Sequence, residues 1–224
     1  MNLKLHSPGA TDLVSQAYAY IKRKIVTNEL KSGDALSISA LSKELNISRT
    51  PITAACQRLE YDGFVNIVPK QGVVVRFLTV NEARDITELR AAIETYSAKR
   101  VFHVIDKEDI ANLEEGFVRM AKSRVNLYQF MLEDTGMHKY LLGKGSNDQF
   151  LSIVDNLYDL SVLIGLMTGQ DPARLDDILQ EHRNIIDALI DKDMDRFVRS
   201  LDINIMNGFI SLSGQYIRNV GTLV

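Results

Sequence analysis

Four polar residues in the second half of the chain fall on otherwise apolar helical faces, and their types are those that bind divalent metal ions. Asp134 and His138 are four residues apart, so both side chains lie on one face of a helix. His182 and Asn204 fall within later apolar stripes of the same kind. Imidazole and carboxylate groups suit Zn²⁺, Ni²⁺ or Mn²⁺. The spacing therefore favours one divalent metal held by Asp134, His138 and His182, with Asn204 as a fourth or water-mediated ligand.

A fifth polar position of this kind is Arg90, which lies on an apolar face with Glu94 at the edge of that face. Buried charged groups need partners, because an unpaired charge loses its hydration without compensation. Arg90 would pair bidentately with a carboxylate ligand. The alternative is a satisfied polar network without a metal, in which Asp134 hydrogen-bonds one of the histidines.

These residues must be positioned by helices, because no strand pattern is found in the region that holds them. Helical periodicity runs from about Asn81 to about Tyr216, with breaks near Asp106, Arg124, 143–147 and 169–172. This pattern predicts an all-helical bundle of six to seven helices over residues 79–224.

Residues 1–78 have a different pattern. A helix is predicted over Asp12–Asn28, followed by a short helix with Ser37 as its N-cap. The next helix is expected to open with Thr50 as its cap and Pro51 at its first position. Two β-type runs, 64–68 and 73–77, follow and are joined by a tip at 69–72. The fold is therefore expected to be mainly α, with a winged helix-turn-helix domain over 1–78.

Charge is divided between the two halves. Residues 1–78 carry ten basic and six acidic side chains, a net charge of +4, whereas the whole chain has a net charge of −3. The basic half is thus expected to approach a polyanion. Ser48, Arg49, Thr50 and Thr53 would lie at the N-terminal end of the helix that enters the major groove of DNA, and Lys70 would lie at the tip of the wing.

Bulk features point to a cytoplasmic protein without a membrane partner. No apolar run reaches the roughly 20 residues that a membrane helix needs. The first ten residues, Met1–Ala10, lack the basic start and apolar centre of a signal peptide. The single cysteine, Cys56, excludes an internal disulfide and is interpreted as a buried apolar residue.

The first half resembles the DNA-binding domain of GntR-type regulators, on Ile47-Ser48-Arg49-Thr50-Pro51, Gly63-Phe64 and Gln71-Gly72. Ser39 stands where that family often has an arginine, and Thr53 begins a stretch where the family usually reads Arg-Glu-Ala-Leu. The resemblance therefore implies an operator that differs from the family's usual one. It places the DNA contacts at Ser37, Ser39, Ser48, Arg49, Thr50, Thr53, Lys70, Gln71 and Gly72.

From about Thr79 the chain resembles the FCD effector domain of the FadR-like branch of this family, on Leu89 to Glu94, Asp134 to His138, Asn147 and Glu181 to Leu189. Its metal-binding members use Asp-x-x-x-His, a second His and a third His, and Asn204 stands at the third His. An amide is a weaker ligand than imidazole. The resemblance implies a small carboxylate effector at Arg90 and Glu94, and a homodimer that reads a pseudo-palindromic operator in double-stranded DNA.

The leading hypothesis is thus a transcription regulator whose operator binding is modulated by an effector, and not an enzyme. One alternative is a metal-dependent enzyme on a helical bundle. It would need a general base such as Glu133 or Glu181, and neither is expected on an inward face. The other alternative is an architectural protein that binds DNA without sequence preference.

Overall fold

The computed structural model describes residues 10–145, 147–169 and 171–221, and it divides into two compact units, Met1–Phe77 and Leu78–Val224. Apart from Ala10, the N-terminal stretch examined for a signal peptide, Met1–Ala10, lies outside the described residues. Each unit has its own buried apolar side chains, so each folds around a core of its own.

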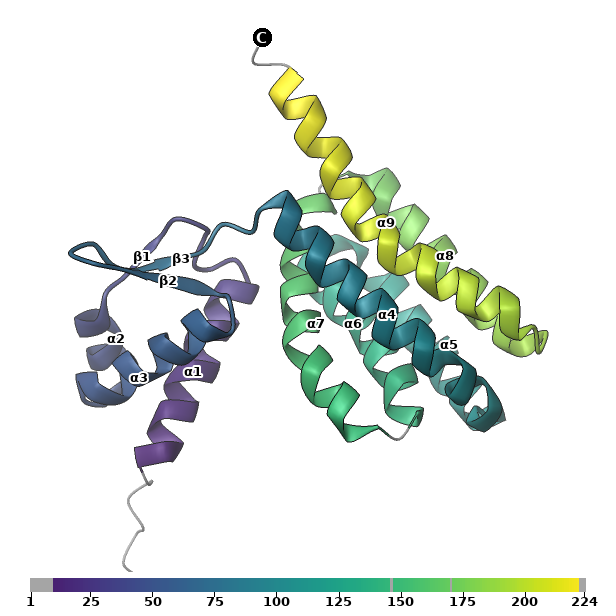
Figure 1. Ribbon diagram of the computed structural model, residues 1–224, viewed down its shortest axis with the longest axis horizontal. Coiled ribbons are helices and arrows are strands. Elements are labelled where there is room, and N and C mark those ends of the chain that lie inside the picture. The colour runs from purple at the N-terminus through teal and green to yellow at the C-terminus, as the bar shows by residue number, and fades with distance from the viewer. Residues whose placement is uncertain (1–9, 146, 170, 222–224) are drawn as a thin grey trace, which may run out of the picture. The chain divides into compact units, whose positions relative to one another are not determined.

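The first unit contains the predicted helices and hairpin in the predicted order. Its strands form one antiparallel sheet in the order β1-β3-β2, with Val65 opposite Val75 and Val68 opposite Gly72. This is a winged helix-turn-helix, and Figure 1 shows the tip of the β2–β3 hairpin extending past the helices. The elements are α1 (Ala10–Val26), β1 (Ala35–Leu36), α2 (Ile38–Leu45), α3 (Arg49–Tyr61), β2 (Val65–Val68) and β3 (Gly72–Val75).

The first strand, β1, is absent from the sequence prediction, because two residues are too few to show the alternation of apolar and polar residues that indicates a strand. The core of this unit is formed mainly by α1, α3 and the start of the hairpin, through Ile21, Ile52 and Phe64. Cys56 is fully buried in α3, as expected, and burial raises the pKa of its thiol to about 11. The thiol therefore remains protonated and packs as an apolar group.

Of the two predicted N-caps in the helix-turn-helix, the cap of α2 is correct and the cap of α3 is wrong. Ser37 is the N-cap of α2, and its side chain accepts a hydrogen bond from the backbone N–H of Ala40 at 3.2 Å, which confirms that prediction. The predicted cap Thr50 is wrong, because Ser48 is the N-cap of α3 and the helix begins at Arg49. Pro51 is thus the third helical residue. It is still in the first turn, where its missing N–H leaves no helical hydrogen bond unmade.

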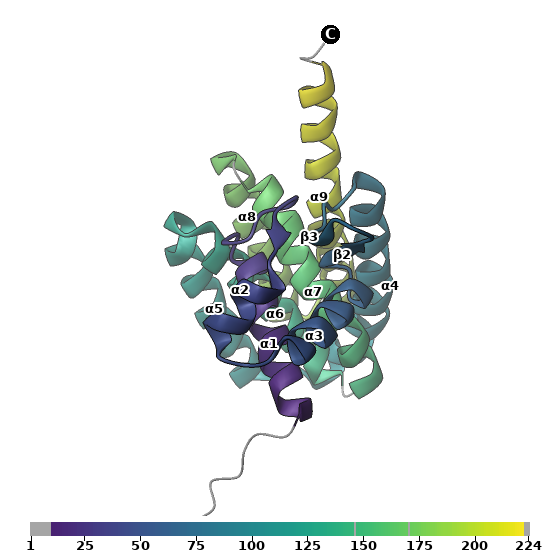
Figure 2. The ribbon, with the colours of Figure 1, turned by 90° about the vertical axis from the view of Figure 1, so that its left-hand side faces the viewer.

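The second unit is all-helical, which confirms the predicted bundle. Within the described residues it has six α-helices and one short 3₁₀ turn, Ser123–Val125, and small polar residues cap the helices at the predicted breaks. The long last helix packs against α4 and α8, and its C-terminal part extends beyond them in both ribbon views (Figures 1 and 2). The helices are α4 (Val80–Val104), α5 (Lys107–Lys122), α6 (Leu127–Lys144), α7 (Asp148–Thr168), α8 (Pro172–Ile190) and α9 (Met194–Gly221).

Among the described residues, α7 is the one helix that has the length and apolar composition to cross a membrane. It packs against α6, α4 and α9 of the bundle. It is also interrupted by Asp155 and Asp159, so it is not a continuous apolar run. Core helices of soluble bundles have the same properties, and one such helix does not by itself indicate a membrane protein.

The contact between α6 and α7 depends on a glycine. A Cβ atom at Gly165 would lie 2.9 Å from Cγ of Met131 and closer still to its Sδ. Met131 is only 2% exposed and has little room to move away. Gly165 therefore allows α7 to approach α6 more closely than any larger residue would.

We expect Gly165→Ala to lower the free energy of unfolding by about 1–3 kcal/mol, because the added methyl group overpacks this contact. Gly136→Ala in α6 is a matched control, since Gly136 is exposed and no atom lies within 4 Å of an added Cβ. The control should raise the free energy of unfolding by up to about 1 kcal/mol through helix propensity. Urea unfolding measures both, and equal stabilisation by the two substitutions would contradict the close-packed contact.

Candidate functional site

The residues predicted to contact DNA lie at the N-terminal ends of α2 and α3 and on the hairpin tip of the first unit. Eight of the nine are exposed, and Ser39 is half-buried. At the N-terminal end of α3, the Thr53 hydroxyl donates to the carbonyl of Arg49 at 3.0 Å, which holds Thr53 against its own helix. The exposed residues are Ser37, Ser48, Arg49, Thr50, Thr53, Lys70, Gln71 and Gly72.

Sequence reasoning missed Gln57 on this surface. It is exposed on α3, four residues after Thr53 and eight after Arg49, so the three side chains lie along one helical face. The signal was the spacing of four from Thr53. Arg58, by contrast, lies with its guanidinium 4.2 Å from the centre of the Tyr18 ring and 3.9 Å from the Asp62 carboxylate, so it belongs to the packing of this unit.

The tip of the hairpin presents a lysine. The backbone N–H of Gln71 donates to the carbonyl of Val68 at 3.1 Å, which closes a turn over Pro69 and Lys70. Lys70 has a φ of 67°, in the left-handed region that non-glycine residues rarely adopt. This conformation places an exposed positive charge at the end of the wing.

In the second unit, the predicted polar residues come together in a buried hydrogen-bonded chain that begins on α4. Arg90 Nε donates to Glu94 Oε1 at 2.9 Å, and Glu94 Oε2 lies 2.7 Å from His138 Nδ1 on α6. His138 Nε2 lies 2.8 Å from Asn204 Oδ1 on α9. All four side chains are at most 6% exposed. The chain links three helices through charged and polar groups.

The same chain continues from α9 to α8. Asn204 Nδ2 donates to Glu181 Oε2 at 2.9 Å, and Asn207 Nδ2 donates to Glu181 Oε1 at 2.7 Å. Arg174 donates to both Glu181 oxygens, at 2.7 and 3.2 Å. Glu181 therefore accepts four hydrogen bonds from three side chains, and its charge is compensated within the bundle.

Three sequence-based expectations are corrected here. Glu181 was expected away from the inward face but is 9% exposed, because α8 is covered by both α5 and α9. Glu94 is not at the edge of the buried face but is 3% exposed, because α4 packs against α6, α7 and α9. Arg90 hydrogen-bonds Glu94 instead of a metal-binding carboxylate, and the negative charge of Asp134 acts on it from a longer distance.

Arg174 was also missed by the sequence analysis, although one signal was present. It is the third residue of α8 and follows Pro172, in the first turn, where acidic residues are favoured by the helix dipole. A basic residue in that position that is nevertheless 8% exposed needs a nearby carboxylate, which Glu181 provides.

The ionisation of Glu94 follows from its partners. Burial by itself would raise the pKa of this carboxyl, but the positive charge of Arg90 and the contact with His138 outweigh burial and hold the pKa at about 2. Glu94 is therefore a carboxylate at neutral pH, and it fixes the orientation of both Arg90 and the His138 ring.

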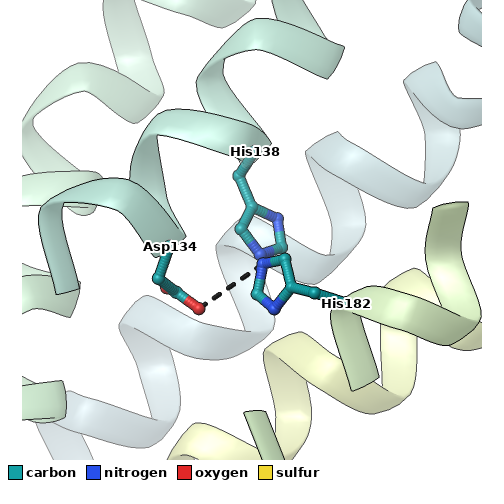
Figure 3. Close-up of side chains that lie close together, drawn as sticks. All are labelled: Asp134, His138 and His182. Carbon is teal, nitrogen blue, oxygen red and sulfur yellow. Dashed lines mark ion pairs between the residues drawn. The ribbon is translucent and has the colours of Figure 1, made fainter. Parts of the chain in front are cut away.

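Three potential metal ligands converge between α6 and α8. Figure 3 shows Asp134 and His138 from α6 directed toward His182 from α8. One ligand atom from each of the three residues lies within 4.8 Å of the others. The two imidazole rings meet edge to face with their centroids 5.4 Å apart. These residues are a group whose donor atoms approach one another closely enough to hold one ion.

The protonation of His182 indicates which of its atoms would bind a cation. Burial lowers the pKa of His182, which keeps the ring neutral at pH 7. Nδ1 lies 3.0 Å from the carbonyl of Ile178, so it carries the hydrogen. The bare Nε2 has no hydrogen-bond partner among the described residues and lies 3.5 Å from Asp134 Oδ1. Two electron-rich atoms that face each other fit a cation between them, and ligand atoms of tetrahedral Zn²⁺ are about 3.3 Å apart.

A small cavity adjoins this group. Its volume is about 50 Å³, and it is lined from α4, α6, α7, α8 and α9. The charged and polar residues on its wall include Arg90, Asp134, His138, Arg174 and Asn204. Members of the hydrogen-bonded chain and two of the potential metal ligands, Asp134 and His138, thus border one cavity.

Both units match known families. Residues 13–75 match the model described as "Bacterial regulatory proteins, gntR family", and residues 85–205 match the FCD domain model. The chain is 25% identical to the "Uncharacterized HTH-type transcriptional regulator YdhC" of Bacillus subtilis (strain 168) over 84% of each chain. It is 26% identical to the "HTH-type transcriptional repressor RspR" of Escherichia coli (strain K12), over 83% of this chain and 82% of that protein.

A solved structure shows the same fold. "E. coli McbR/YncC" is 19% identical, with a TM-score of 0.78 over 91% of this chain and 98% of that chain. The family matches include the winged helix-turn-helix in one unit and most of the helical bundle in the other. The chain therefore belongs to the GntR family of bacterial regulatory proteins, and it is a DNA-binding transcription regulator with a C-terminal FCD domain.

Proposed function

We propose that α3 and the wing read an operator, and that a small carboxylate effector, together with a divalent metal in the FCD domain, modulates this binding. One observation carries the effector part of this proposal. The bare Nε2 of His182 faces the Asp134 carboxylate next to a cavity whose wall includes Arg90, a buried arginine with an unused N–H group. Such a site supports binding of a cation and an anion side by side.

The DNA part of the proposal is supported by the chemistry of the exposed face of α3. Ser48 and Thr50 carry hydroxyl groups beside the free backbone N–H groups of the helix N-terminus, an arrangement that suits phosphate. Arg49 is able to pair with a phosphate or with guanine, and the amide of Gln57 matches the edge of adenine. Ser37, Ser39, Thr53 and the wing residues Lys70, Gln71 and Gly72 are proposed as further contacts.

The metal would be held by Asp134, His138 and His182, with the amide oxygen of Asn204 as the fourth ligand. His182 donates from Nδ1 to the Ile178 carbonyl, and His138 Nδ1 lies against Glu94, so each ring has the orienting partner that metal-bound histidines use. His138 would release Asn204 to bind the ion through Nε2. A bound Zn²⁺, Ni²⁺ or Mn²⁺ supplies positive charge for a carboxylate in the cavity.

The regulator is proposed to act as a homodimer on a pseudo-palindromic operator, in the cytoplasm where its DNA is found. An effector changes DNA affinity only through its different affinities for the two arrangements of the DNA-binding domains, typically by about 1–3 kcal/mol. The hydrogen-bonded chain would carry this coupling within the protein, because Asn204, which lines the cavity, hydrogen-bonds Glu181 and so links α9 to α8.

A catalytic role is a weaker proposal. Glu181 does lie inside the bundle, but both of its oxygens accept hydrogen bonds from Arg174, Asn204 or Asn207. Glu133 accepts from Arg119 and Gln129 in a more exposed position. These carboxylates are engaged as structural acceptors. The curated relatives quoted above are named as transcriptional regulators, and we propose no catalytic activity for this chain.

We expect Arg49→Ala to weaken specific operator binding about 10- to 100-fold, because one base or phosphate contact is worth roughly 1–3 kcal/mol. Fluorescence anisotropy with operator DNA at several salt concentrations measures this loss. Arg100→Ala removes an exposed charge from the other unit and is expected to leave binding unchanged. Equal binding by wild type and Arg49→Ala would remove this end of α3 from the reading surface.

We expect His182→Ala and the larger His182→Gln to lose bound metal at least about 10-fold and to lose the effector response, because the bare Nε2 is gone. Operator binding without effector should be retained, since His182 lies in the other unit. Metal content after dialysis and DNA binding with and without effector are the measurements. His103→Ala, an exposed histidine of α4, is the control. Full metal content in both His182 variants would contradict the proposed ligand set.

A further inference from the structure

Two buried arginines face the same cavity from different helices. Arg90 on α4 is 6% exposed and Arg174 on α8 is 8% exposed, and both line the cavity of about 50 Å³. They lie at the two ends of the hydrogen-bonded chain that runs through Glu94, His138, Asn204 and Glu181. Buried arginines are uncommon, and two in one wall indicate a ligand with more than one anionic group.

Each arginine is bound to its own glutamate in a way that leaves one N–H group unused. Arg90 uses Nε toward Glu94, and its Nη2 has no hydrogen-bond partner among the described residues. Arg174 uses Nη1 and Nη2 toward Glu181, and its Nε is likewise without a partner in the described part of the chain. A buried donor without an acceptor costs free energy that a ligand oxygen would recover.

We propose that the effector is a short dicarboxylate, with one carboxylate accepting from Arg90 Nη2 and the other accepting from Arg174 Nε. This inference rests on the proposed function, in which the cavity takes a carboxylate, and it adds Arg174 as the second anion-binding residue. Glu94 and Glu181 are positioning residues that hold the two guanidinium groups. A water needs about 10–15 Å³ of such a volume, so the cavity of about 50 Å³ has room for about three to five waters, and only a short ligand fits. Dicarboxylates of three or four carbons are the matching class.

The charges around the cavity require a cation for this ligand. Each arginine is already balanced by its glutamate, so Asp134 is left as the uncompensated carboxylate on the wall. A dianion placed beside Asp134 alone would be repelled. A divalent ion bound to Asp134, His138 and His182 reverses the sign of this local charge. The dicarboxylate is therefore expected to bind more tightly with the metal than without it.

The test compares malonate and succinate with acetate and propionate by isothermal titration calorimetry, on the full-length protein loaded with Zn²⁺ or Mn²⁺ and after chelation. On the metal-loaded protein, the better dicarboxylate should bind about 10- to 100-fold more tightly than either monocarboxylate, because it makes a second charge-assisted hydrogen bond. Arg174→Lys keeps the charge beside Glu181 but lacks the Nε donor. It should bind dicarboxylates no more tightly than monocarboxylates.

Arg183→Lys is the matched control, since Arg183 lies on the same helix and pairs bidentately with Glu114, at 2.7 Å for both contacts, away from the cavity lining. It should keep the full preference for dicarboxylates. Arg90→Lys is a second variant that should lose the preference too, and the wild-type comparison stands even where a variant fails to fold. Equal affinity of mono- and dicarboxylates for the wild type would overturn the inference and leave the proposed function in place. A preference that survives Arg174→Lys would overturn the role of Arg174. Absence of binding by all four acids, with metal present, would overturn both proposals.

Discussion

The helical domain depends on the pairing of charges that have been taken out of water. Arg90, Glu94, Glu181 and Arg174 are all at most 9% exposed, and each would be strongly unfavourable inside the bundle by itself. Breaking one buried pair by removing a partner typically costs about 3–5 kcal/mol. The hydrogen-bonded chain links side chains of α4, α6, α9 and α8 in that order, so it fixes the positions of these helices relative to one another. The cavity exists where this register leaves the two guanidinium groups and Asp134 on a common wall.

Asn204 is the residue that makes this chain continuous. An amide has one accepting end and one donating end, so it bridges a histidine on one side and a carboxylate on the other. Asn204 Oδ1 lies toward His138, and its Nδ2 donates to Glu181. The residue proposed as a fourth metal ligand is thus the one that connects His138 with Arg174, through Glu181.

The structure of the DNA-binding unit depends more on interactions between residues close in sequence than the structure of the helical domain does. Its sheet is fixed by a short hairpin in which Val65 pairs with Val75 and Val68 with Gly72. Its motif helices begin at small polar residues, Ser37 and Ser48. Side chains at the start of α3 and at the wing tip remain exposed, because Ile52, Leu59 and Phe64 supply the core on the opposite face. The surface that we propose to read the operator therefore depends on local interactions and on the packing of α1 against α3.

The sequence by itself determined the helices, the β2–β3 hairpin and the inward direction of Asp134, His138 and His182, because these follow from periodicity and capping within one element. It did not predict the two-residue strand β1 or the N-cap of α3. Only the tertiary structure decided that Glu181 and Arg174 also lie inside, since the buried width of α8 depends on its two neighbours, α5 and α9. It also decided the partners. Glu94 meets His138 from 44 residues away, and Asn204 meets His138 from 66 residues away. Such pairs are determined by how the helices pack against one another, and they cannot be predicted from the periodicity of a single helix.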